Sequence, residues 1–109
     1  MSSSLSLLLL FLAAVLEAGG DALMRAGMRS PVPLRIALLL AGAAVLFVYG
    51  YTVNAPRWDF GRLLGVYVVL FFIVAQAIAW LAFRQPPSHA TLLGGAFILA
   101  GGVIVFARG

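Results

Sequence analysis

The sequence contains no cysteine and no lysine, a single histidine and only three acidic residues in 109 positions. The lack of cysteine excludes a disulfide framework and a thiolate metal site. Neither a glycine-rich phosphate-binding loop nor a Ser/His/Asp set is visible, and His89 lies close to prolines in an expected loop. We therefore expect a protein that is not an enzyme and that uses no metal and no cofactor.

Charge is also scarce, because charged residues make up 9% of the chain while hydrophobic residues make up 64%. A soluble domain is nearer one quarter charged and one half apolar, so a water-soluble fold of this size could not bury so much apolar surface. The net charge of +4 comes from seven arginines that lie near expected loops and chain ends. Such a distribution suits lipid headgroups better than nucleic acid.

Long apolar runs fill most of the chain. A helix needs about 20 residues to cross a hydrocarbon core of about 30 Å, and four segments qualify: 4–24, 34–53, 61–83 and 90–107. Prolines occur in every gap between them and favour helix ends there. The segments are apolar throughout and too long for transmembrane strands. The sequence thus predicts an all-α, four-span integral membrane protein with a single domain over residues 1–109, whose first segment is retained rather than cleaved.

Glu17 is the most unusual residue of the first span. Counted from Leu5 at 1.5 Å per residue, it lies about 18 Å along the helix, near the middle of the bilayer. A carboxylate there costs about 3 kcal/mol on insertion scales, and no basic residue is expected at a similar depth. We expect Glu17 to be protonated when nothing is bound, or to face an aqueous cavity and bind a cation. The alternative is a hydrogen bond to Gln76, the only other strongly polar side chain deep in a later span, which would merely join two helices.

Asp21 follows Glu17 by one helical turn and precedes Arg25 by another. This order and spacing favour an Asp21–Arg25 ion pair near the membrane surface. The other interpretation makes Asp21 a second acidic station on the route to Glu17. Gly19 and Gly20 remove side-chain bulk beside the acid, which would let a helix or a ligand come close.

Two glycine pairs recur in the last span, Gly94 with Gly95 and Gly101 with Gly102. Their spacing of seven residues, nearly two helical turns, puts them on one face, and such a face lets two helices approach closely in lipid. Four helices also make a thin bundle that could hardly enclose a polar cavity alone. Both points favour a homodimer that uses these four glycines.

Together these features resemble the small multidrug resistance family, within the drug/metabolite transporter superfamily, over nearly the whole chain. The similar stretches are "EAGGDALMR" with Glu17, "GRLLGVY" with Gly61 and Tyr67, Trp80 near the end of the third span, and the Gly94/Gly101 spacing. Leu64 and Tyr67 stand where the family has other aromatic residues, the second span lacks a proline-glycine signature, and Asp21 is an added acid. These departures indicate a divergent branch.

The resemblance implies an antiparallel homodimer in the plasma membrane of a bacterium, which exchanges protons for a small organic cation or polar metabolite. It assigns the shared proton and substrate role to Glu17 and makes Tyr67 an aromatic wall that offers its π-face to a cation. Gly20, Asp21 and Gln76 complete the expected site. Two alternatives remain open: a non-transporting membrane subunit with a partner chain, and the translocation of lipid or lipid-linked sugar.

The distribution of arginines predicts insertion in both orientations. The side that holds the first and third loops has four arginines and the opposite side has three, so the positive-inside rule has almost nothing to act on. The four are Arg25, Arg29, Arg35 and Arg84, and the three are Arg57, Arg62 and Arg108. A topology reporter fused to the C-terminus should give signal on both sides of the membrane, whereas a strictly one-sided signal would mean a fixed orientation.

Overall fold

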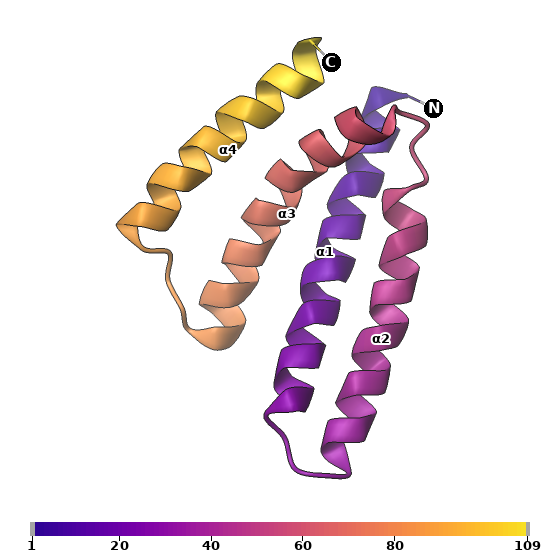
Figure 1. Ribbon diagram of the computed structural model, residues 1–109, viewed down its shortest axis with the longest axis vertical. Coiled ribbons are helices and arrows are strands. Elements are labelled where there is room, and N and C mark those ends of the chain that lie inside the picture. Colours follow the sequence, from indigo (N-terminus) through magenta and orange to yellow (C-terminus); the bar gives the residue numbers. More distant parts are fainter. Residues whose placement is uncertain (1, 109) are drawn as a thin grey trace.

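The computed structural model describes residues 2–108, which form four helices and no strand (Figure 1). The helices are α1 (Ser3–Met28), α2 (Leu34–Val53), α3 (Phe60–Phe83) and α4 (His89–Arg108). Each is long and apolar enough to cross a membrane. The predicted all-α, four-span architecture is confirmed. Positions 1 and 109 of the predicted domain lie outside the described residues.

The helix ends follow the expected spans closely, except that α1 continues to Met28. The apolar run ends before Arg25, but the backbone keeps its helical hydrogen bonds until Pro31 approaches. The hydroxyl of Ser30 then donates to the carbonyl of Ala26 at 2.8 Å, and the Arg29 N–H donates to the same carbonyl at 3.2 Å, so both bonds close the last turn of the helix. The helix is therefore longer than its hydrophobic segment, and its last turn carries Arg25.

Local side-chain and backbone bonds define the other ends. The Ser2 hydroxyl accepts from the Leu5 N–H at 3.1 Å, and the Ser88 hydroxyl accepts from the Thr91 N–H at 3.1 Å. A serine therefore caps the N-terminus of both α1 and α4. Arg84 adopts a left-handed conformation at φ 55° and ψ 40° after α3. The Gln85 N–H then donates back to the Ala79 carbonyl at 2.9 Å, which closes that helix.

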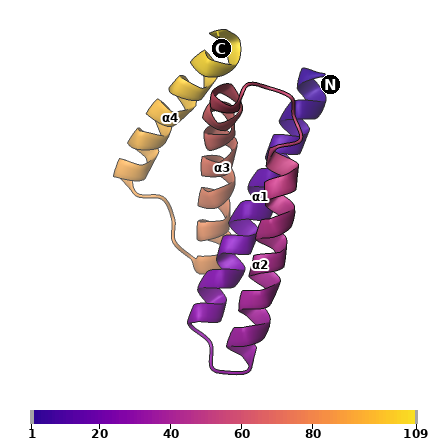
Figure 2. The ribbon, with the colours of Figure 1, turned by 45° about the vertical axis from the view of Figure 1, so that its right-hand side comes forward.

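The helices are arranged side by side in the order α4, α3, α1, α2, and α4 lies on the far side of α3 from the other two (Figures 1 and 2). Both chain ends and the α2–α3 loop lie at the same end of the molecule, as an even number of spans requires. α1 is thus the central helix, with α2 on one side and α3 on the other.

Glycines allow α1 and α2 to approach closely. A Cβ atom added at Gly20 would lie 2.8 Å from the side chain of Leu46, and one at Gly42 would lie 3.1 Å from the Gly20 carbonyl oxygen. A larger residue at either position would require the neighbouring side chains, Leu46 or Met24, to move. This is the small-residue packing that holds helices together in lipid, where no hydrophobic force drives them together.

The buried core is small and is centred on the α1–α3 contact. Leu10, Ala13 and Ala14 of α1 and Leu63 of α3 are almost fully buried. Large apolar side chains on the outer faces remain exposed in the chain, including Leu81 at 84% and Phe97 at 73%. Since lipid tails are as apolar as these side chains, their exposure is what a membrane-spanning bundle requires.

Arg62 joins the first turn of α3 to the last turn of α4. Its Nη2 donates to the Phe106 carbonyl oxygen at 3.0 Å, and its guanidinium lies 4.3 Å from the centre of the Trp58 ring. The carbonyl is one of those that a helix C-terminus leaves without an intrahelical partner. Arg62 therefore fastens α4, which packs mainly on α3, at the end that carries the termini.

The four glycines of α4 divide into two sets. A Cβ atom at Gly95 would lie 2.6 Å from the Phe72 ring, and one at Gly102 would collide with Val69, so both glycines pack against α3 of the same chain. Gly94 and Gly101 have nothing within 4 Å of an added Cβ atom. The predicted dimer face of four glycines is thus reduced to Gly94 and Gly101, because the α3–α4 contact already uses the other two.

The substitution Gly102→Ala should destabilise the α3–α4 contact, because its new methyl group collides with Val69. Overpacking of this kind costs about 1–3 kcal/mol. Gly101→Ala is the matched control, since its methyl group enters open space within the chain. Unfolding of both variants in a detergent that keeps the protein monomeric should show a loss for Gly102→Ala alone. Equal stability of the two variants would contradict the packing described.

Candidate functional site

A hydrogen bond between two spans defines the site. The Tyr67 hydroxyl of α3 donates to Glu17 Oε1 of α1 at 2.7 Å. Tyr67 is 5% exposed, and Glu17 is half-buried. The sequence predicted both residues as site members, and the structure brings them into direct contact although fifty positions separate them.

Small side chains on α1 allow this contact. Ala13, Ala14 and Ala18 surround Glu17 on the buried side of the helix and are at most 6% exposed. With only methyl groups between the backbones, α3 comes near enough for a tyrosine side chain to span the remaining distance. Leu63 and Val66, each one turn or less before Tyr67, pack into the same core and set the rotation of α3.

Aromatic rings continue the site on both sides of Tyr67. The ring of Tyr49 in α2 lies 5.9 Å from that of Tyr67, and the ring of Phe71 lies 6.0 Å from it on α3. Tyr49 is a close neighbour of both Glu17 and Tyr67. Sequence reasoning missed Tyr49. The available signal was a hydroxyl-bearing side chain well inside the second span, in the stretch "FVYGY".

Gly20 and Asp21 lie one turn beyond Glu17 but face different neighbours. Gly20 is buried against Leu46 of α2, so it serves the α1–α2 contact. Asp21 is exposed and lines a groove of about 160 Å³ between α1 and α3, which Phe71 and Phe83 also line. The groove begins beside the Glu17–Tyr67 pair and runs toward the C-terminal ends of both helices.

Arg25 has a different partner from the one its spacing favoured. Its guanidinium lies 5.4 Å from the centre of the Phe83 ring, in a cation–π contact between α1 and α3. No ion pair joins Asp21 and Arg25 in the part of the chain that the structure describes. The sequence could not reveal this contact, because Phe83 comes from another span.

Gln76 is not brought to the site. On α3 it follows Gly65, Val69 and Phe72 at helical spacings, and these three residues contact α4. It lies nine residues, or half a turn in rotation, from Tyr67 and so belongs to the opposite face of the helix. Within residues 2–108, Glu17 receives its hydrogen bond from Tyr67 and none from Gln76.

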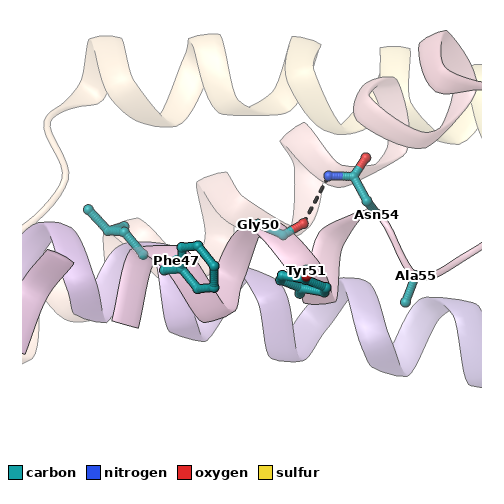
Figure 3. A pocket seen from close by; sticks show the side chains of 6 residues that line it. Phe47, Gly50, Tyr51, Asn54 and Ala55 are labelled. Atoms are coloured by element: carbon teal, nitrogen blue, oxygen red, sulfur yellow. Dashed lines mark hydrogen bonds between the residues drawn. The ribbon is translucent and has the colours of Figure 1, made fainter. Parts of the chain in front are cut away.

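A larger hollow, about 670 Å³, lies elsewhere (Figure 3). Residues of α2 and the following loop form its walls, among them Phe47 and Tyr51, whose rings are 5.7 Å apart. Asn54 turns its amide back to donate to the Gly50 carbonyl at 2.9 Å. The hollow is a broad apolar groove whose lining includes no acidic or basic side chain, unlike the surroundings of Glu17.

Four spans, with a half-buried glutamate on the central one, define a class, the small multi-pass membrane protein with an acid in a membrane-spanning helix. The family model described as "Uncharacterised BCR, YnfA/UPF0060 family" matches residues 4–109, and the chain belongs to this family. No solved structure matches the chain significantly.

Curated relatives agree with this assignment. A "UPF0060 membrane protein" of Mycobacterium marinum is 39% identical over 94% of this chain and 93% of its own length. "UPF0060 membrane protein YfjF" of Bacillus subtilis is 37% identical over 90% of this chain and 89% of its own. A "UPF0060 membrane protein" of Herpetosiphon aurantiacus is 29% identical over 92% and 91%. The predicted location as a multi-pass membrane protein is confirmed.

The substitution Tyr67→Phe should lower the free energy of unfolding by about 1 kcal/mol, the usual net contribution of one hydrogen bond. It removes the donor to Glu17 and keeps the ring that packs on Tyr49 and Phe71. Tyr51→Phe is the matched control, because Tyr51 is 76% exposed. Unfolding in detergent, followed by circular dichroism, checks both variants. An equal effect of the two substitutions would mean that the Tyr67–Glu17 bond adds no stability.

Proposed function

We propose that this protein is a proton-coupled antiporter that exports a small organic cation or polar metabolite through Glu17. The observation that carries the proposal is the environment of this carboxyl group. It lies on a membrane-spanning helix, and within the described residues its hydrogen-bond donor is a neutral phenol rather than a cation.

A carboxyl group in these surroundings has two stable states, a protonated one and a cation-bound one. A lone carboxylate in an apolar medium is very costly, so the group either takes up a proton or holds a cation. The two conditions exclude each other, because one carboxylate cannot bind both tightly. Exchange of one for the other at a single group is the basis of coupled antiport.

The surrounding residues suit the same task. The Tyr67 hydroxyl donates a hydrogen bond to the carboxylate, and its ring face can contact a cation. Tyr49 adds a second ring beside it. The half-exposed position of Glu17 leaves it open to a ligand. A polar site of this kind needs shielding from lipid, for which a second copy of the chain is the simplest source.

The resemblance to the small multidrug resistance family supports an antiparallel homodimer as that arrangement. Gly94 and Gly101 remain open on α4 and offer a flat surface for a second helix. In the proposed cycle the site opens alternately to the two sides of the membrane as the subunits rock around it. Glu17 releases its proton, binds the cation, and regains a proton after the cation leaves.

Glu17→Gln should abolish proton-driven flux of a small cation in proteoliposomes, because an amide cannot exchange a proton. The variant keeps a carbonyl oxygen that can accept from Tyr67, so it should fold and elute as the wild-type protein does. Asp59→Asn is the control, since Asp59 is an exposed acid at the start of α3.

Flux by Asp59→Asn should equal that of the wild-type protein. Undiminished proton-driven flux by Glu17→Gln would refute the antiport mechanism. Purification of the protein only together with another chain would instead support the non-transporting subunit considered from the sequence.

A further inference from the structure

The groove between α1 and α3 has a composition that Glu17 does not explain. It holds about 160 Å³, and its lining consists of Asp21, two phenylalanines and small or aliphatic side chains. The groove is open because four of its lining residues have only a methyl side chain: Ala18, Ala22, Ala75 and Ala79. Asp21 is the only charged residue among them and lies at the exposed side of the groove.

Asp21 has no partner that would account for a charge at this depth. It lies seven residues, about 10 Å, before the end of α1. Arg25, the cation nearest to it in sequence, is engaged with the Phe83 ring. Among residues 2–108 no ion pair or hydrogen bond involves the Asp21 carboxylate. A structural role as one half of a surface ion pair is therefore unsupported.

The aromatic walls of the groove are suited to a positive charge. The Phe83 ring already holds the Arg25 guanidinium at 5.4 Å, so Phe71 is the ring of the groove that remains for a ligand. Phe71 lines the same groove closer to Glu17, and its ring neighbours Tyr67 at 6.0 Å. Phe71 therefore lies one turn from Tyr67, whereas Phe83 lies twelve residues, about 18 Å, farther along α3.

We infer that this groove is a second cation-binding site, in which Asp21 and the ring of Phe71 hold a small organic cation one turn away from Glu17. The inference rests on the proposed function, for which it supplies the position that cargo occupies before Glu17 gives up its proton. The carboxylate neutralises the charge, and the Phe71 ring and the alanines contact the apolar part of the cation.

The volume limits the cargo. An apolar cavity of about 150 Å³ accommodates one benzene molecule, so the groove of about 160 Å³ accepts a cation of one ring or less. Tetramethylammonium meets this limit, whereas tetraphenylphosphonium, with four rings, exceeds it. The groove would therefore admit small cations and exclude larger ones before they reach Glu17.

Binding of tetramethylammonium to the purified protein, measured by titration calorimetry, tests the inference. Glu17→Gln should retain weak binding, because Asp21 still provides a site. The double variant Glu17→Gln/Asp21→Asn should bind at least tenfold more weakly than Glu17→Gln. The control Glu17→Gln/Asp59→Asn carries the same loss of charge at a distant exposed acid and should bind as Glu17→Gln does.

A variant that fills the groove distinguishes binding inside the groove from attraction to the Asp21 charge alone. Ala75→Leu in the Glu17→Gln background fills the groove and keeps Asp21, so it should also lose the residual binding, provided that it elutes as the parent does. Tetraphenylphosphonium should show no dependence on Asp21 in any of these backgrounds.

Two outcomes would overturn the inference: no residual binding in Glu17→Gln, or equal binding with and without Asp21. Neither outcome bears on flux, so the antiport proposal fails separately, by proton-driven transport that survives Glu17→Gln.

Discussion

A carboxyl group inside a hydrocarbon layer needs a hydrogen-bond or charge partner, and the structure is organised around the partner of Glu17. Its partner is the hydroxyl of Tyr67 at 2.7 Å, a donor that carries no charge. A basic partner would have neutralised Glu17 permanently. A phenol donates a hydrogen bond without a charge of its own, which is compatible with the proton exchange that the proposed function requires.

The bond to Tyr67 in turn depends on small residues. The alanines of α1 bring α3 close on one side, and Gly20 with Gly42 brings α2 close on the other. As a result three spans contribute to one site, with Glu17 from α1, Tyr49 from α2 and Tyr67 from α3. In lipid this closeness cannot come from hydrophobic collapse, so it is obtained from tight packing of small side chains. α4 remains outside, fastened by Gly95, Gly102 and Arg62, with Gly94 and Gly101 facing outward.

The central helix α1 also carries the polar residues that lie between the site and the membrane surface. Glu17, Asp21 and Arg25 follow one another at intervals of four residues on α1, and Tyr67, Phe71 and Phe83 accompany them on α3. Both helices run in the same direction (Figure 1), so Asp21 and Phe71 each lie about one turn beyond Glu17 and Tyr67. The groove that Asp21 and Phe71 line thus lies next to the Glu17–Tyr67 pair, on the side toward the C-terminal ends of α1 and α3.

The number of spans, their approximate ends and the presence of an acid at mid-membrane were determined by the sequence alone, because hydropathy and proline are local properties of the chain. The four predicted spans agree with the helices apart from the extra turn at Met28. The tertiary structure decided which partner each polar group meets. It pairs Glu17 with Tyr67 rather than Gln76, places Arg25 on Phe83 rather than Asp21, adds Tyr49, and turns one glycine of each α4 pair inward. In a helix that is apolar on all sides, the sequence carries little information on rotation about the helix axis. That rotation is set by the packing of small and large side chains between helices, which exists only once the helices have assembled.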